Sequence, residues 1–362
     1  HTSEAQHQGN VLDSKIIEAE SQKLEHSGIE VPQAHDQGIM LDSTQSNVVQ
    51  RTLERTRVLI GRDLVTSEDI YWEYGNEALA NRHLIVFGRS GQGKTYCIQA
   101  LLSELARAHI NSLVIDYTNG FLPAHLEKEF KQLVNPKTDL IAHAPIDLNP
   151  FKKQKSVIAG FELKDKAHDV ATRVASVFNS VFSSIGEQQL PTLIRVIEEG
   201  IELYGSDYNF TKMLKELEEY DATGAKLANK LMPIVKANIF ACKDNENGWQ
   251  AIFQDRESMC RLIQMATLSR DVWHAATEFI LWDLYSHACL QGDKNKPLPV
   301  VLDEVQNLDH RLDSPLAKML TEGRKYGLSL ILATQTLSNL KKEEQDRLFQ
   351  AAHKLFFAPA ET

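Results

Sequence analysis

The chain has 362 residues, of which 43% are hydrophobic and 24% are charged, an ordinary composition for a globular protein. No apolar stretch approaches the roughly 20 residues that a membrane-spanning helix needs, and no signal peptide opens the chain, so we expect no membrane partner and a cytoplasmic location. The four cysteines are scattered and include no C-x-x-C pair, which argues against a disulfide framework and a zinc site.

The net charge of −10 is unevenly distributed along the chain. Residues 1–50 contain eight acidic and two basic side chains, so the rest of the chain carries a charge of only −4. A body this close to neutral can still line a channel with Lys and Arg. The total charge therefore does not exclude a nucleic-acid partner.

Residues 1–50 are rich in Gln, Ser, Glu and His and have no sustained hydrophobic period. This composition is typical of a poorly ordered linker or arm. The chain begins with His1 rather than Met, so we expect it to be part of a longer protein with functions carried upstream.

Order is expected to begin near Val58. The apolar runs 58–60 and 70–72 flank a polar stretch and predict a hairpin that leads into the core. The short runs that follow are apolar on both faces, which is typical of buried parallel strands covered by helices on each side. These runs are residues 84–87, 113–115, 262–265, 300–302 and 328–332, with 355–357 as a further candidate.

Helical patterns alternate with these runs. Ser314 and Pro315 are typical of an N-cap and first helical position, and Gly327 is expected to end that helical segment. Residues 120–258 are dominated by a period of 3.6 and predict a mostly helical insertion. The predicted fold class is therefore α/β, with a doubly wound, mainly parallel sheet over residues 51–362 and a helical subdomain inserted in it.

A glycine-rich loop follows the first core strand. Residues 88–95 have the sequence Gly-Arg-Ser-Gly-Gln-Gly-Lys-Thr, which matches the phosphate-loop pattern G-x-x-x-x-G-K-[ST] between a strand and a helix. Backbone N–H groups of such a loop close around phosphate at a positive helix N-terminus. We expect a nucleoside triphosphate to contact Gly88, Ser90, Gly91, Gln92, Gly93, Lys94 and Thr95, with the Thr95 hydroxyl on Mg²⁺.

The apolar run that ends at Leu302 is followed by two carboxylates. In a phosphate-loop fold Asp303 would complete the Mg²⁺ shell, and Glu304 would polarise the attacking water. Because adjacent strand residues point to opposite sides, both can serve only if the chain turns where the strand ends. The alternative is a solvated acidic turn, and the phosphate loop favours the catalytic interpretation.

Three residues near the last core strand are further candidates. Gln335 ends that strand at the edge where ligands bind, so it is expected to contact the γ-phosphate or orient water, unless it merely closes the strand. Arg324 and Lys325 each offer a cation for transition-state charge, often supplied by a neighbouring subunit. A cation in the last turn of a helix is also favoured by the helix dipole, and the residues alone do not separate the two.

The nucleotide base is predicted from a missing motif. The sequence lacks the Asn-Lys-x-Asp signature that recognises guanine, because the nearest match, Asn339-Leu340-Lys341-Lys342, has no Asp. ATP is therefore expected rather than GTP.

Together these residues resemble the FtsK/HerA superfamily of P-loop pumps, which includes the VirB4 and TraG-type secretion and conjugation ATPases. The resemblance implies a RecA-like P-loop NTPase fold, and it selects Arg324, eleven residues before Gln335, as the arginine finger. The matching features are Asn81-Arg82-His83, the loop 88–95, Asp116, Asn149-Pro150-Phe151, Asp303-Glu304, the segment 322–327 and Thr334-Gln335.

Within that superfamily, residues 72–95 are most similar to the large ATPase of DNA-phosphorothioation-dependent restriction systems (DptH/DndH type). The resemblance implies an ATP-hydrolysing DNA translocase that works as a hexameric ring on double-stranded DNA. Its partners would be other subunits of a defence system, including a nuclease. Two alternatives stay open, namely a VirB4/TraG-like secretion or conjugation ATPase and a nucleotide-gated assembly subunit. The acid Glu304 weighs against the second.

Two basic clusters are candidates for DNA contact on loops that face a ring channel. One comprises Lys152, Lys153 and Lys155, and the other comprises Lys341 and Lys342. Each cluster is alternatively a solvated face without a ligand. Phosphate contacts by either cluster would make DNA affinity fall steeply with salt.

Overall fold

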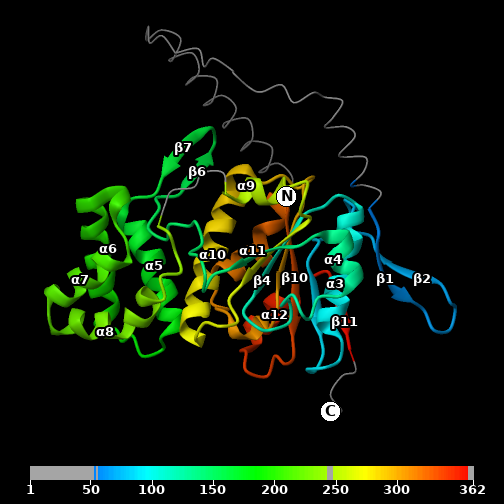
Figure 1. Cartoon of the computed structure of the whole chain (residues 1–362). Helices are drawn as coiled ribbons and strands as arrows, with labels where there is room; N and C mark the ends of the chain where they lie inside the picture. Colours follow the sequence, from blue (N-terminus) through cyan, green and yellow to red (C-terminus); the bar gives the residue numbers. More distant parts are fainter. Residues whose placement is uncertain (1–52, 54–55, 243–247, 358–362) are drawn as a thin grey trace, which may run out of the picture. The chain divides into compact units, whose positions relative to one another are not determined.

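The apolar runs expected from the sequence form the centre of one sheet in this computed structural model, which describes residues 53, 56–242 and 248–357 (Figure 1). Within these residues the sheet has seven strands in the order β11-β3-β10-β9-β4-β8-β5, and all neighbours pair in parallel. The strands are β3 (Leu84–Phe87), β4 (Ser112–Asp116), β5 (Lys137–Leu140), β8 (Cys260–Gln264), β9 (Leu298–Leu302), β10 (Leu328–Thr334) and β11 (His353–Phe356).

Helices alternate with these strands, and the helical segment before β10 begins and ends at residues with clear local causes. The Ser314 hydroxyl accepts the N–H of Ala317, as predicted for an N-cap, and Gly327 ends the following 3₁₀ turn in the left-handed region. The helices of the sheet layer are α3 (Lys94–Arg107), α4 (Lys128–Val134), α10 (Arg270–Gln291), α11 (Pro315–Glu322) and α12 (Lys342–Leu348).

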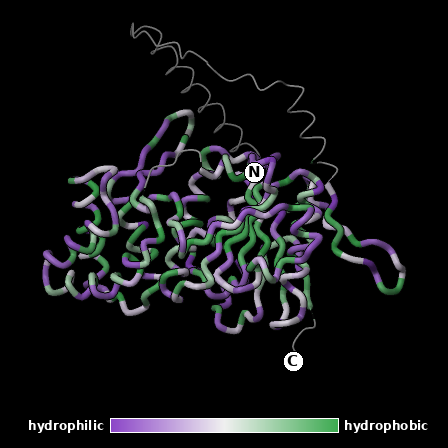
Figure 2. Tube along the Cα trace, in the orientation of Figure 1, coloured by the Kyte–Doolittle hydropathy of each residue, from purple (hydrophilic) through white to green (hydrophobic). Residues whose placement is uncertain are grey.

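Both faces of the sheet are buried under helices. In β3, Leu84 and Val86 belong to the hydrophobic cluster that contains α3 and α4, whereas Ile85 belongs to the cluster that contains α10 and α11. This split follows from strand alternation, and Figure 2 shows the hydrophobic residues concentrated along the central strands. The predicted doubly wound α/β fold is confirmed.

A group of helices follows β5 and packs beside α10 (Figure 1). Helices α5 and α8 contact α10 directly, and the other helices pack on α5 and α8. The group comprises α5 (Ala167–Val181), α6 (Gln189–Tyr204), α7 (Phe210–Tyr220) and α8 (Ala222–Lys236), with the short α9 (Gly248–Phe253) closer to β8.

The predicted insertion at 120–258 includes a strand that belongs to the main sheet. Helix α4 and strand β5 fall inside that range, yet β5 pairs with β8 as the edge strand of the main sheet. Strand β5 has the sequence Lys-Thr-Asp-Leu and is largely exposed, so no apolar run revealed it. The remaining boundaries of the insertion, and its status as a separate subdomain, stay predictions.

Within the described ranges, two antiparallel hairpins lie outside the main sheet. The hairpin predicted at 58–72 is present as β1 (Val58–Arg62) paired with β2 (Asp69–Trp72). A second hairpin, β6 (Lys155–Ile158) with β7 (Phe161–Lys164), was not expected, because residues 155–157 and 161–164 are exposed and form no apolar run. The predicted linker at 1–50 lies outside the described residues. In the part of the chain that the structure describes, no helix is long and apolar enough to cross a membrane.

Candidate active site

A cleft of about 700 Å³ lies at the edge of the sheet where β3, β4, β9 and β10 end. Parallel strands deliver their carboxyl ends to one edge, so segments distant in sequence meet there. Gly88 and Gln92 belong to the loop but are not among the lining residues. The lining consists of Ser90, Gly91, Gly93, Lys94, Thr95, Thr118, Asn119, Gly120, Asp303, Glu304, Asn307 and Gln335.

The glycine-rich loop joins β3 to α3 with two residues in the left-handed region. Gly91 has φ 77° and Gly93 has φ 91°, conformations that a side chain would strain. Gly93 is the N-cap residue of α3 and offers no capping side chain. The N–H groups of the first helical turn are therefore available to a bound anion.

Lys94 and Thr95 begin α3 and carry their polar groups to the cleft. Lys94 is only 7% exposed, and its ammonium donates to the carbonyl of Gly88 at 2.8 Å and to that of Arg89 at 3.3 Å. This places one positive charge inside the curve of the loop. The arrangement suits the phosphates of a nucleotide, with the Thr95 hydroxyl beside them.

The chain turns sharply where β9 ends. Glu304 adopts the left-handed conformation with φ 47° and ψ 45°, and its N–H donates to the Asp303 carboxylate at 2.8 Å. Side chains of adjacent strand residues would otherwise point to opposite sides. The turn brings both Asp303 and Glu304 into the lining of the cleft. The sequence analysis required such a turn if both carboxylates were to act in one site.

The Glu304 carboxylate is held by two amide side chains. The Nε2 group of Gln335 donates to Oε1 at 2.5 Å, and the Nε2 group of Gln306 donates to Oε2. The side-chain oxygen Oε1 of Gln306 in turn accepts a hydrogen bond from the Thr334 hydroxyl at 2.7 Å. Gln335 is thus a direct partner of the acid, and Gln306 is a contributor that the sequence analysis missed.

Asp303 is 8% exposed. Burial, followed by the nearby Glu304 carboxylate, raises the pKa of Asp303 to about 6. A bound divalent cation would favour the ionised form. Among the described residues no cluster of three or more His, Cys, Asp or Glu could hold a metal ion. Mg²⁺ does not require one, because it usually binds one or two carboxylates together with substrate phosphates and water.

The segment after β4 forms one wall of the cleft that the sequence did not single out. Residues 118–120 line it, whereas Asp116 is fully buried beneath them. The Asp116 carboxylate accepts the N–H groups of Thr118 and Phe121 at 2.8 and 2.9 Å, so it shapes the segment rather than facing the cleft. Residues 118–120 follow a predicted parallel strand, and this position could have identified them as candidates for the ligand-binding edge.

Arg324 lies at the opposite edge of the sheet from the cleft. It precedes β10, whereas Gln335 follows it, and the seven residues of β10 span roughly 20 Å. The Arg324 guanidinium donates to the carbonyl of Glu77 at 3.4 Å and lines a small pocket with Arg82 and Lys294. The structure therefore does not bring Arg324 to the cleft of its own chain. It could reach a nucleotide only on another subunit.

Comparison with known proteins gives concordant results. The family model described as "Helicase HerA, central domain" matches residues 60–281. The probable helicase MJ1565 of Methanocaldococcus jannaschii is 23% identical over 329 residues, which cover 84% of this chain and 59% of that relative. The chain thus spans well under two thirds of the relative's length.

Two solved structures were found to be similar to this chain to different degrees. VirB4 of Thermoanaerobacter pseudethanolicus superposes with a TM-score of 0.61 at 15% identity and covers 84% of each chain. The bacterial conjugative coupling protein TrwBdeltaN70 has a TM-score of 0.48 at 16% identity, covering 85% of this chain and 73% of that one. The VirB4 likeness shows the fold, which agrees with the parallel sheet described above.

The raised pKa of Asp303 predicts a stabilising substitution. The folded pKa of about 6 lies above the ordinary 3.8, so ionisation of Asp303 costs free energy in the fold. This cost develops as the pH rises from about 4 to about 6 and is constant above. Asp303→Asn keeps an oxygen for the Glu304 N–H without the charge. At pH 8, without nucleotide, it should be more stable than the wild type by on the order of 1–3 kcal/mol.

Denaturant unfolding of both proteins between pH 5 and pH 8 measures this difference. The advantage of the variant should shrink at pH 5, where the wild-type carboxyl is largely protonated in the fold. Equal stability at pH 8, or an advantage that grows toward low pH, would contradict the assigned pKa shift.

Proposed function

The chain belongs to the HerA helicase central-domain family, and from this premise we propose that it is the ATP-hydrolysing motor of a DNA translocase. The observation that carries the proposal is the geometry of Glu304. Its carboxylate lies in the same cleft as the phosphate loop and is oriented by Gln306 and Gln335. A subunit that only bound nucleotide would not need a carboxylate held in this way.

The cleft assigns separate tasks to its residues. The loop 88–95 binds the phosphates of ATP through backbone N–H groups and the Lys94 ammonium. Thr95 and Asp303 would hold Mg²⁺, which would neutralise charge that develops on the phosphates. Glu304 accepts a hydrogen bond from the attacking water and orients it, with Gln335 fixing the carboxylate. Arg324 of a neighbouring copy completes the site, so the active form is a ring, which we take to be a hexamer.

The lysines near the β6–β7 hairpin are the better candidates for DNA contact. Lys152, Lys153, Lys155 and Lys164 line one hollow of about 460 Å³, so their charges converge. Lys155 is partly neutralised by Glu162 at 3.1 Å. In the second cluster, Lys342 is exposed and pairs with Asp346 at 3.5 Å, which reduces its charge. A duplex backbone would therefore engage Lys152 and Lys153 first.

The biological setting is a finer part of the proposal. Similarity at residues 72–95 supports the ATPase subunit of a phosphorothioation-dependent restriction system, which would act with a partner nuclease. A VirB4/TraG-like secretion or conjugation ATPase would share the same motifs. The moved substrate, DNA or protein, separates these functions.

Two variants separate nucleotide binding from turnover. Lys94→Ala removes the positive charge inside the loop, so it should abolish both ATP binding and hydrolysis. Glu304→Gln keeps the phosphate contacts and should bind ATP normally while turnover falls by about 10²–10⁴-fold. Binding of a labelled ATP analogue and phosphate release measure the two effects. A Glu304→Gln protein with normal turnover would remove Glu304 from the catalytic role.

Mixed rings test whether Arg324 acts between subunits. Arg324→Ala should bind ATP almost normally yet lose hydrolysis, by up to about 10³–10⁵-fold where an arginine finger is supplied. Mixing Arg324→Ala with Lys94→Ala protein should restore part of the activity, because some interfaces then combine an intact loop with an intact arginine.

Lys325→Ala is the matched control for the mixed rings, since it removes a neighbouring cation in the same turn and should leave turnover unchanged. Absence of complementation in rings shown to contain both variants would reject a site shared between subunits. Activity in a strictly monomeric preparation would reject it as well.

Charge removal in the hollow tests the DNA contact. Replacing Lys152 and Lys153 by Gln should weaken duplex binding and reduce the slope of log affinity against log salt by about 2. The matched control replaces Lys341 and Lys342 by Gln and should leave both quantities unchanged. Fluorescence anisotropy across a salt series measures them. An unchanged slope in the first variant would argue against this assignment.

A further inference from the structure

Tyr117 is a buried side chain next to the cleft, and none of the roles proposed above involves it. It follows β4 directly and is 7% exposed. Its hydroxyl lies within hydrogen-bonding distance of two successive carbonyl oxygens, that of Asp303 and, at 2.9 Å, that of Glu304. One O–H group, whose single proton is shared between the two oxygens, thus contacts the backbone on both sides of Glu304.

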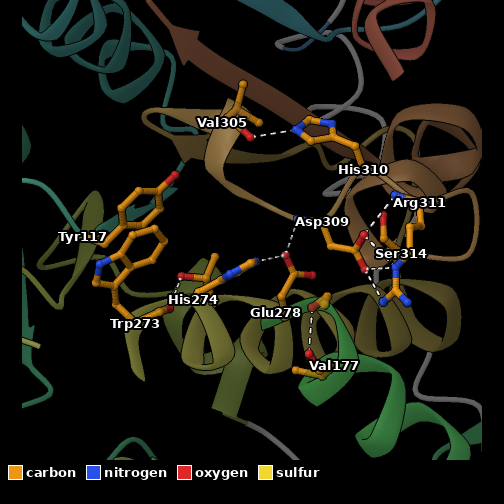
Figure 3. A network of polar contacts seen from close by, with 12 residues as sticks. Tyr117, Val177, Trp273, His274, Glu278, Val305, Asp309, His310, Arg311 and Ser314 are labelled. Carbon is orange, nitrogen blue, oxygen red and sulfur yellow. Dashed lines mark hydrogen bonds and ion pairs between the residues drawn. The ribbon is translucent and has the colours of Figure 1, made fainter. Parts of the chain in front are cut away.

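The Tyr117 ring is fixed from below by Trp273. The two side chains lie against each other in Figure 3. Their rings stack with centroids 4.1 Å apart and planes 3° from parallel. Trp273 lies in the first turn of α10, and its carbonyl accepts the Thr277 hydroxyl at 2.8 Å. Stacking of this kind restricts where the phenol oxygen can lie, so α10 sets the position of the hydroxyl under the turn.

The far end of the segment after β9 is anchored to α10 independently. The carboxylate of Glu278, which is 1% exposed, accepts the N–H of Asp309 at 2.8 Å (Figure 3). The Asp309 carboxylate pairs with Arg311, whose guanidinium donates to the Ser176 carbonyl of α5 at 2.8 Å. Loss of the Tyr117 hydroxyl would therefore loosen the turn at Glu304 without releasing residues 305–311.

The surroundings of Tyr117 keep its hydroxyl a donor. Burial, and then the carboxylates of Asp303 and Glu304, raise the pKa of Tyr117 well above its ordinary value. The phenol therefore carries its proton at every pH at which the enzyme would work. The Glu304 carbonyl also accepts the N–H of Asn307 at 3.0 Å, so the Asp303 carbonyl depends more on the phenol as its donor. An unpaired buried carbonyl costs free energy.

We propose that Tyr117 is a positioning residue for ATP hydrolysis. Its hydroxyl stabilises the left-handed conformation of Glu304, so that the carboxylate meets Gln306 and Gln335 in the cleft. Its stack on Trp273 links that turn to α10, the helix on which α5 and α8 pack. The proposal rests on the hydrolytic role of Glu304 proposed above.

Tyr117→Phe tests this role, because it removes the hydroxyl and keeps the ring on Trp273. Turnover at saturating ATP should fall by about tenfold, while the dissociation constant of a non-hydrolysable ATP analogue stays within about twofold. In a Glu304→Gln background the same substitution should have no further effect, since Tyr117 acts through that carboxylate.

The matched control is Tyr208→Phe. Tyr208 is also buried, and its hydroxyl donates to Glu216 at 2.8 Å beside α7, away from the cleft. This variant should lose stability without losing turnover. If Tyr117→Phe melts far below the wild type, Trp273→Phe offers a second comparison, in which a weaker stack should lower turnover and leave ATP affinity unchanged.

Three results would overturn the positioning role. They are normal turnover by Tyr117→Phe, a parallel loss of ATP affinity, and a further tenfold loss in the Glu304→Gln background. Normal turnover by Glu304→Gln itself would instead refute the catalytic assignment of the acid, and the role of Tyr117 with it. The two failures are therefore distinguishable.

Discussion

The left-handed turn at Glu304 is the constraint on which the rest of the site depends. Strand alternation would send the side chains of Asp303 and Glu304 to opposite sides of β9. A non-glycine residue in this conformation carries a cost on the order of 1 kcal/mol, so neighbouring groups must stabilise it. The Asp303 carboxylate binds the Glu304 N–H, and Tyr117 binds the two carbonyls. The proposed magnesium ligand, Asp303, and the proposed water-orienting acid, Glu304, then line one cleft.

The parallel sheet gives the molecule two functionally different edges. The carboxyl edge holds the phosphate loop and the acid turn, and the amino edge holds Arg324 beside Glu77 and Arg82. A site that needs groups from both edges cannot be completed within one chain. It requires a head-to-tail contact in which different surfaces of two copies meet, and such contacts form a ring when the rotation between copies closes. Strand direction is thus the reason for proposing a shared site.

The sequence predicted the parts of the fold that local pattern determines. Runs apolar on both faces revealed the inner strands, and the loop 88–95 was recognisable because its glycines and Lys94 have a fixed spacing. Strand β5 was missed because an exposed edge strand needs no apolar run. Tyr117 and Gln306 were missed because their roles depend on contacts across the sheet: Tyr117 reaches residues 186 and 187 positions away. Arg324 was selected by resemblance to a family. The structure shows in addition that Arg324 lies too far from the cleft of the same chain to contact a nucleotide there.

The most direct test of the proposed motor is the rate of ATP hydrolysis by the wild-type protein with and without duplex DNA at one fixed ionic strength. A DNA translocase should hydrolyse ATP faster when duplex is present, and the stimulation should saturate with DNA concentration. A rate that is substantial but indifferent to duplex DNA would contradict the account and favour a secretion ATPase with the same cleft.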